Sequence, residues 1–376
     1  MQHVSFAQMA VTALLVALLP LAMVWISKDT NKYRKLVWVA VFLTFDLIVF
    51  GAFTRLTDSG LGCPDWPGCY GLANPFLAHE EIRAAEALMP TGPVTMMKAW
   101  IEMIHRYLAM SIGILIVAMM AVAWWRWLAR RKAPQLAQRM PPAYPTFLFF
   151  FVCLQGAFGA WTVTLKLQPV IVTGHLLLGM GLLALLAWFG GREDQLHAPL
   201  APAPAGAPLG RIRLMAALSG AVLLVQLALG AWVSTNYATL ACTEFPLCGG
   251  ELVPPMDFEH GFHLWRELGK TAAGHYLPFS ALTAIHWVHR NFAAVVLLVL
   301  GATAWQAWRV DGLRRHARWI AVIVVLQALS GIATIFLNFP LAIAVVHNAG
   351  AAALVLLLTM LNYRARYLAV PSKNQE

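Results

Sequence analysis

The sequence predicts an all-α polytopic membrane protein, with two pseudo-symmetric four-helix bundles and one extra N-terminal transmembrane helix. Three observations support this fold class. Hydrophobic residues make up 60% of the 376-residue chain and charged residues only 12%, whereas an ordinary soluble domain has about 25% charged residues. Long apolar stretches recur along the chain. The second part of the sequence also repeats a set of residues found in the first.

The apolar stretches are long enough to cross a membrane as helices. A bilayer core of roughly 30 Å requires about 20 apolar residues in a helix. The stretches are too long for barrel strands, and they do not alternate between polar and apolar residues. The first one has no basic leading segment and no clear cleavage site, which predicts a retained helix rather than a signal peptide. The nine stretches lie at approximately 4–26, 36–56, 101–125, 144–164, 170–190, 213–235, 280–308, 317–337 and 341–363.

The charge distribution explains the net charge of +10 without a nucleic-acid partner. If residues 28–35 lie in the cytoplasm and the following connections alternate sides, the cytoplasmic connections hold most of the Lys and Arg residues. The opposite side then holds most of the acids. This is the positive-inside bias of membrane proteins. It predicts an N-terminus outside and a C-terminus in the cytoplasm.

An internal repeat relates the two parts of the chain. The matched residues occur in the same order, and each matched pair of helices has the same predicted orientation. We therefore expect a parallel duplication, related by an axis along the membrane normal. The matches are Gly51 with Gly230, Cys63 with Cys242, Cys69 with Cys248, Glu102–Arg106 with His286–Arg290, Gln155 with Gln327, and His175 with His347.

The repeat and the composition together predict the domain organisation. The connection between the halves is rich in Ala and Pro, which is typical of an extended, flexible linker. Two outer loops, 57–99 and 236–279, have lengths typical of functional or disordered loops. The expected segments are 1–35 (extra helix and cytoplasmic loop), 36–190 (N-terminal half), 191–212 (cytoplasmic linker), 213–363 (C-terminal half) and 364–376 (cytoplasmic tail).

Four histidines at repeat-related positions are candidate ligands: His105, His175, His289 and His347. All are predicted near the outer ends of their helices. Two imidazoles on different helices of one bundle can face each other across its interior, which suits a haem iron. A single such histidine would more simply bond a backbone carbonyl, but the recurrence favours ligands. Zinc would require four convergent ligands, and no such cluster is evident.

The repeat is broken at one position that bears on chemistry. Glu102 precedes His105 by three residues on the same helical face, whereas His286 precedes His289. A carboxylate at membrane depth is costly to desolvate, so Glu102 is a candidate catalytic proton acceptor or stabiliser of positive charge. The alternative is a buried carboxylate that only pairs with Arg106. The asymmetry predicts that one half performs the chemistry and the other holds a cofactor.

Two cysteine pairs lie in the outer loops, on the oxidising side of the predicted topology. Cys63 and Cys69 form the first pair, and Cys242 and Cys248 form the second. A disulfide with five intervening residues is sterically feasible in a loop. Structural staples and a redox role are both compatible with this pattern.

The segments Thr54–Cys69 and Glu102–Arg106, together with His175, His289 and His347, resemble the haem A synthase family. The resemblance covers about residues 36–363, and the extra N-terminal helix departs from it. It implies an inner-membrane enzyme that oxidises the C8 methyl of haem O to a formyl group by two successive hydroxylations, for cytochrome oxidase biogenesis. The residues implied by position are catalytic Glu102; His105 and His175 around haem O; His289 and His347 on the iron of a haem b cofactor; two loop disulfides; and Arg106, Arg290 and His286 as secondary site residues.

The resemblance also implies partners, and it competes with other classes of protein. Haem O synthase (protohaem farnesyltransferase) and a membrane electron carrier such as quinone are the implied partners, within the lipid bilayer. A di-haem b protein that exchanges electrons with quinol would use the same histidines, but it gives no reason for the difference between Glu102 and His286. A thiol oxidoreductase would depend on Cys63 and not on His347. A transporter is disfavoured because the polar groups lie near one face rather than at the midplane.

Overall fold

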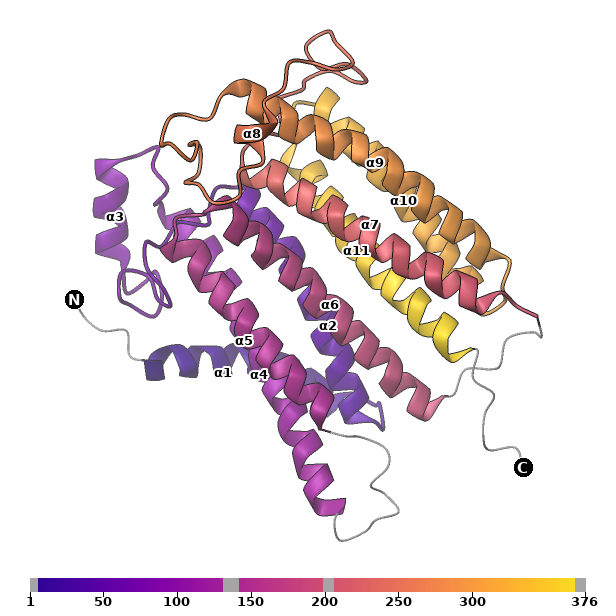
Figure 1. Ribbon diagram of the computed structural model, residues 1–376. Coiled ribbons are helices and arrows are strands. Elements are labelled where there is room, and N and C mark those ends of the chain that lie inside the picture. Colours follow the sequence, from indigo (N-terminus) through magenta and orange to yellow (C-terminus); the bar gives the residue numbers. More distant parts are fainter. Residues whose placement is uncertain (1–5, 131–141, 199–205, 369–376) are drawn as a thin grey trace. The chain divides into compact units, whose positions relative to one another are not determined.

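The computed structural model describes residues 6–130, 142–198 and 206–368. Within these ranges the chain is helical, with three isolated β-bridges and no strand. Nine of the helices are long and apolar enough to cross a membrane, so the prediction of an all-α polytopic membrane protein is confirmed (Figure 1). These nine helices are α1 (Phe6–Ile26), α2 (Lys32–Leu56), α4 (Met96–Arg130), α5 (Ala143–Thr164), α6 (Pro169–His197), α7 (Leu209–Thr235), α9 (Phe279–Trp308), α10 (Arg314–Phe336) and α11 (Leu341–Tyr367).

The outer loops also contain short helices, α3 (His79–Leu88) and α8 (Phe258–Gly261). Asp257 caps α8, because its carboxylate accepts a hydrogen bond from the backbone N–H of His260 at 3.0 Å. Ala78 precedes α3 and offers no side-chain cap. Both long loops therefore contain ordered secondary structure between their flanking spans.

The repeat is visible in the backbone where helices end. Two residues after the last residue of α2 and of α7, Asp58 and Tyr237 adopt left-handed φ values of 50° and 55°. After α5 and α10, the pairs Lys166–Leu167 and Asn338–Phe339 do the same. These residues occupy equal positions in the two halves. An αL residue of this kind ends a helix and turns its last carbonyls toward loop amides, so the same local signal ends both helices of each matched pair.

Contacts divide the described chain into two compact units. The first comprises the described parts of Met1–Leu167 and Gly181–Leu196, and the second comprises those of Gln168–Met180 and His197–Glu376. In the first unit α4 contacts α1, α2 and α5. The C-terminal part of α6 joins the same unit, where Tyr144 of α5 donates a hydrogen bond to the Leu185 carbonyl at 2.8 Å. The extra helix α1 is thus an integral part of the first unit.

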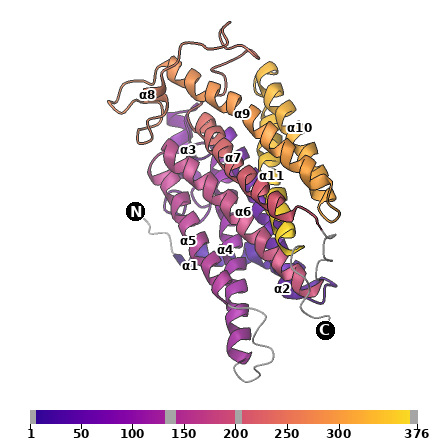
Figure 2. The same ribbon diagram turned by 45° about the vertical axis from the view of Figure 1, so that its right-hand side comes forward.

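The second unit is a bundle of α7, α9, α10 and α11, which run side by side in both ribbon views (Figures 1 and 2). Its core is almost wholly aliphatic, with Leu300, Ile320 and Leu361 fully buried. Because lipid tails are as apolar as leucine, these side chains stabilise the bundle by van der Waals packing rather than by exclusion of water. One polar pair crosses this core, where the hydroxyls of Ser219 and Thr303 lie 2.8 Å apart. The hydroxyl of Thr303 donates to the Val299 carbonyl at 2.9 Å, so Ser219 donates to Thr303 and both buried hydroxyls are bonded.

The linker prediction is wrong at its N-terminal end. Residues 191–197 continue α6 as helix instead of forming an extended segment. This stretch has no proline, and its Asp194 accepts hydrogen bonds from Trp38 at 3.0 Å and Arg34 at 3.3 Å, both on α2. Residues 209–212 are likewise helical, at the start of α7. Residues 199–205 of the linker and 369–376 of the tail lie outside the described residues.

Candidate functional site

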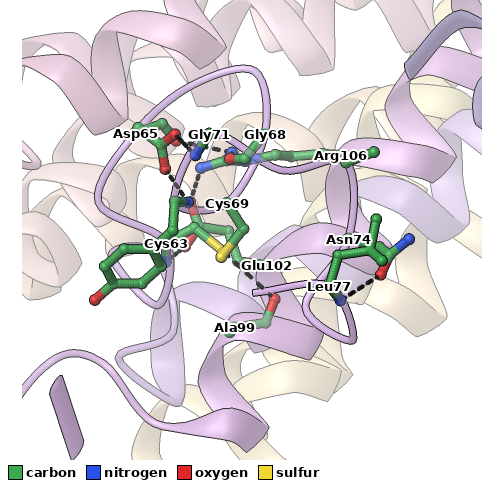
Figure 3. The surroundings of a disulfide bond; sticks show 12 residues. Cys63, Asp65, Gly68, Cys69, Gly71, Asn74, Leu77, Ala99, Glu102 and Arg106 are labelled. Atoms are coloured by element: carbon green, nitrogen blue, oxygen red, sulfur yellow. Dashed lines mark hydrogen bonds and ion pairs between the residues drawn. A yellow bond between two sulfur atoms is a disulfide. The ribbon is translucent and has the colours of Figure 1, made fainter. Parts of the chain in front are cut away.

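The first outer loop is tied into a compact structure by a disulfide and by one arginine. Cys63 and Cys69 are bonded, with their Cα atoms 4.9 Å apart. Arg106, one turn beyond Glu102 on α4, donates hydrogen bonds to the carbonyls of Asp65 at 2.9 Å and Gly68 at 2.5 Å (Figure 3). A guanidinium carries several donors in a fixed plane. A single side chain therefore holds several loop carbonyls over the helix.

Glu102 lies between this arginine and the disulfide. One carboxylate oxygen is 2.5 Å from Nη2 of Arg106, and the other accepts the backbone N–H of Cys63 at 2.9 Å (Figure 3). The side chain is only 4% exposed. Charge-assisted bonds of this kind compensate for the burial of an ion. The carboxylate of Glu102 therefore fixes the disulfide loop to α4, in addition to any role that its negative charge has in chemistry.

Two further contacts shape this loop. Asp65 accepts the backbone N–H groups of Tyr70 at 2.7 Å and Gly71 at 2.6 Å, which closes the turn after the disulfide. A Cβ atom at Gly62 would overlap the backbone of Lys98 on α4, so only glycine permits this close approach. The loop is thus fixed on its helix through both backbone and side-chain contacts.

The second outer loop repeats this construction in the second unit. Cys242 and Cys248 are bonded, with Cα atoms 4.8 Å apart. Arg290 of α9 donates to the carbonyls of Glu244 at 2.8 Å, Leu247 at 3.0 Å and Pro246 at 3.0 Å. Counted along the sequence from the first cysteine, these three residues are at the same positions as Asp65, Gly68 and Pro67. The carbonyls of those residues accept from Arg106 in the first loop. Both loop disulfides implied by the family resemblance are present in the structure.

His286 takes the place of Glu102 in the second loop. Its Nδ1 lies 3.2 Å from the backbone nitrogen of Cys242 and accepts that N–H. The bond corresponds to the one between Glu102 and Cys63. His286, Arg106 and Arg290, which the sequence marked as secondary site residues, are therefore the groups that fix the two disulfide loops to α4 and α9.

Histidines of α9 and α11 pack against glycines within the second unit. A Cβ atom at Gly230 of α7 would lie 2.9 Å from Cε1 of His289, and a Cβ at Gly331 of α10 would lie 3.4 Å from Cε1 of His347. Gly230 therefore allows the ring of His289 to lie close to the α7 backbone.

Side chains that the sequence did not single out contact these two rings. Nε2 of Gln226 lies 3.2 Å from Nδ1 of His289, and Oγ of Ser330 lies 2.8 Å from Nδ1 of His347. The hydroxyl oxygen of Ser330 can accept from Nδ1–H, the ring nitrogen that a metal ligated through Nε2 would leave for hydrogen bonding. The amide nitrogen of Gln226 can only donate, so Nδ1 of His289 accepts this contact. The sequence offered one signal for each residue, a polar side chain in an apolar helix. Gln226 lies four residues before Gly230, and Ser330 lies one residue before Gly331.

His105 and His175 occupy the corresponding helices of the first half. A Cβ atom at Gly51 of α2 would lie 3.0 Å from Nε2 of His105, and the ring of Phe50 stacks on His105 at a centroid distance of 6.4 Å. This repeats the packing of His289 on Gly230. His175 lies in the outer part of α6, which groups with the second unit.

The donor set bears on which metal centre the chain can form. Across the described residues there is no group of three or more His, Cys, Asp or Glu side chains placed to hold a metal ion. Both cysteines of each pair are in disulfides. Haem needs only one or two axial side chains, because the macrocycle supplies the other four ligands. The histidines of α9 and α11 fit that requirement.

These features define a duplicated helical membrane protein with disulfide-closed loops beside glycine-backed histidines. Residues 34–359 match the model of a family described as cytochrome oxidase assembly protein (COX15-CtaA). The match covers most of the chain, and the protein belongs to this family.

Curated relatives point in the same direction. A protein of Shewanella oneidensis named Heme A synthase is 35% identical over 327 residues, which are 86% of this chain and 94% of the relative. Proteins with the same name from Hyphomonas neptunium and a Bradyrhizobium species are each 29% identical. The alignments cover 88% of this chain and 90% of the Hyphomonas protein, and 89% and 91% for the Bradyrhizobium protein. The similarity therefore extends over both halves.

Proposed function

We propose that this protein is a haem A synthase, an oxidoreductase that converts haem O to haem A for cytochrome oxidase biogenesis. The observation that carries the proposal is the repeated disulfide loop with a carboxylate in one half and an imidazole in the other. It occurs in a chain that is 35% identical to a protein named Heme A synthase. In this proposal each of two steps adds the oxygen of one water and releases two electrons and two protons, the electrons passing to a membrane acceptor such as quinone. The C8 methyl group becomes an alcohol and then a gem-diol, which loses water to give the formyl group.

In this proposal the C-terminal half holds a haem b cofactor between His289 and His347. Both imidazoles belong to one bundle, and the hydroxyl of Ser330 is a hydrogen-bond partner for Nδ1 of His347. Gly230 leaves space for the ring of His289 against α7. When bound there, haem b supplies a one-electron relay between the substrate and a membrane electron carrier such as quinone. The side chains supply axial ligation and orientation.

The N-terminal half is the proposed substrate site. His105 corresponds to His289 and is the proposed ligand of haem O, and the sequence repeat alone predicts His175 as the second ligand. Glu102 is the proposed catalytic group. Because its carboxylate is already ion-paired with Arg106 and bound by the Cys63 amide, it acts as a fixed negative charge that stabilises the electron-poor carbon. A proton acceptor would need an oxygen without such partners.

The proposed location is the bacterial inner membrane, with the N-terminus outside and the C-terminus in the cytoplasm. The distribution of Lys and Arg along the sequence supports this orientation. Both disulfide loops then face the oxidising side, where disulfides persist. The haem sites lie toward the same side, because the histidines are near the outer ends of their helices. Haem O synthase is the proposed functional partner, since its product is the substrate.

Expression of this chain together with an enzyme that produces haem O tests the proposal. Haems extracted from the purified protein are identified by mass spectrometry and by the absorption of the formyl-bearing macrocycle. We expect haem A and haem b from the wild type, haem b alone from His105→Ala, and loss of haem b from His289→Ala. Wild-type protein that holds haem b in both halves and leaves haem O unchanged would instead indicate a di-haem electron carrier.

A further inference from the structure

Ser330 of α10 makes a specific contact with His347 of α11. Its Oγ lies 2.8 Å from Nδ1 of the imidazole and 3.1 Å from the backbone carbonyl oxygen of Gln327, one turn earlier on its own helix. All three residues belong to the second unit. The serine therefore connects the ring of one helix to the backbone of its neighbour.

The chemistry of a hydroxyl fixes the direction of these two bonds. Ser330 has one hydrogen to donate, and the carbonyl of Gln327 can only accept. The hydroxyl thus donates to Gln327 and accepts from Nδ1–H of His347. A neutral imidazole with its proton on Nδ1 has its lone pair on Nε2, the atom that a haem iron requires.

The repeat shows that this hydroxyl belongs to one half only. Gln327 and His347 are spaced as Gln155 and His175 are, so the position of Ser330 corresponds to Phe158. The contact of Gln226 with His289 shows the same asymmetry, because its position relative to Gly230 corresponds to Leu47 relative to Gly51. The C-terminal half thus carries polar side chains at two positions where the N-terminal half carries apolar ones.

We propose that Ser330 is a positioning residue that fixes the tautomer of His347 and lowers the reduction potential of the haem b on that ligand. The inference rests on the proposed function, because it requires haem b in the C-terminal half. A hydrogen bond accepted from Nδ1–H raises the basicity of the imidazole. A more basic axial ligand stabilises ferric over ferrous iron, and second-shell hydrogen bonding is one of the means by which a protein sets haem potentials.

The test is a potentiometric titration of haem b in the full-length protein, purified without added haem O. We expect Ser330→Ala to retain haem b with a midpoint potential more positive than that of the wild type. Ser330→Thr keeps the hydroxyl and should restore the wild-type potential. Thr334→Val is the matched control, since its hydroxyl lies one turn further along α10 and bonds only within its own helix, to the Gly331 carbonyl at 2.6 Å. Its potential should equal that of the wild type.

An unchanged potential in a Ser330→Ala protein that binds haem b would overturn the inference. Should Ser330→Ala not retain haem, Ser330→Cys is measured instead; its thiol is a weaker acceptor, so a potential equal to the wild type would again contradict the role. Failure of the proposed function has a different signature. In that case the wild-type protein carries no haem b that depends on His347, as shown by an unaltered spectrum of His347→Ala.

Discussion

The two disulfide loops share a common construction but differ in charge. In both, an arginine one turn further along the helix holds the loop carbonyls, and a side chain four residues before it accepts the N–H of the first cysteine. The accepting group is the carboxylate of Glu102 in the first loop and the imidazole of His286 in the second. Because a neutral imidazole serves this purpose, holding the loop does not require a negative charge. The charge of Glu102 is therefore the feature that a catalytic role explains.

Removal of the anchoring arginine should produce the largest effect on stability, and a larger one in the first loop. Arg106→Ala leaves the buried carboxylate of Glu102 without its ion partner, and breaking a buried pair in this way costs about 3–5 kcal/mol. Arg290→Ala removes bonds to carbonyls and a contact with the Phe245 ring at a partly exposed site, and leaves no buried charge unpaired; this costs about 1–2 kcal/mol. Thermal unfolding of the purified variants measures the difference.

The double variant Arg106→Ala/Glu102→Gln sharpens this comparison. Neutralising the carboxylate should recover part of the stability lost in Arg106→Ala, because the unpaired charge is gone. Equal losses for Arg106→Ala and Arg290→Ala, with no recovery in the double variant, would show that the ion pair adds nothing beyond the carbonyl contacts.

Replacing the glycine that packs against a histidine should have a different effect on bound haem in each half. In Gly230→Ala the new Cβ would lie 2.9 Å from the ring of His289, and such overpacking costs about 1–3 kcal/mol. We expect reduced haem b in this variant. Gly51→Ala, which crowds His105 at 3.0 Å, should leave haem b in place and lower the yield of haem A.

Gly220→Ala provides the control on the same helix as Gly230, because a Cβ there meets no atom within 4 Å. It should retain full haem b and gain up to about 1 kcal/mol of helix stability. Haem b that is lost equally from Gly220→Ala and Gly230→Ala would contradict the packing argument. The pyridine haemochrome spectrum of each variant gives the measurement.

The smallest expected effect concerns the short helices of the two loops. The backbone N–H of His260 lowers the pKa of the Asp257 carboxyl below its usual range, and the side chain of His260 adds to the shift. This capping contribution is therefore present above the ordinary pKa of an aspartate and is lost as the pH falls through the lowered value. Because the Asp257 side chain is partly exposed to solvent, Asp257→Ala should cost under about 1 kcal/mol.

Ala78 precedes α3 in the first loop without a side-chain cap, so only the second loop should show this acid dependence. Limited proteolysis between pH 3 and pH 6 provides the comparison. Cleavage near α8 should increase at the acid end in the wild type, and it should be independent of pH over this range in Asp257→Ala. A pH dependence that survives in Asp257→Ala would assign it to another group.

The sequence allowed the spans, the loop disulfides and the repeat to be predicted, because each leaves a local pattern. A long apolar run indicates a membrane span, and the spacing of Cys63 and Cys69 makes a disulfide between them sterically feasible. It did not predict the helical continuation of α6 through residues 191–197, where Asp194 binds Trp38 of a distant segment. Such contacts depend on how helices pack, which a hydrophobic pattern does not specify.

The same limit applies to the site. Glu102 and the histidines stood out because the repeat marked their positions. The bond between Glu102 and the Cys63 amide joins residues 39 positions apart, and nothing in either segment indicates it. Gln226 and Ser330 were missed because a single polar residue in an apolar helix has many explanations. Gln226 and Ser330 gain a specific role only from the histidine ring that the structure places beside each of them.

We propose that the charge of Glu102, and not its hydrogen bond to the loop, serves the reaction. Glu102→Gln retains an acceptor for the Cys63 amide and removes the charge, and Glu102→His gives the first loop the acceptor of the second. Haem extraction after expression with a source of haem O tests both variants directly. We predict intact disulfides and bound haem b, with no conversion of haem O to haem A. Wild-type yields of haem A from either variant would contradict the claim.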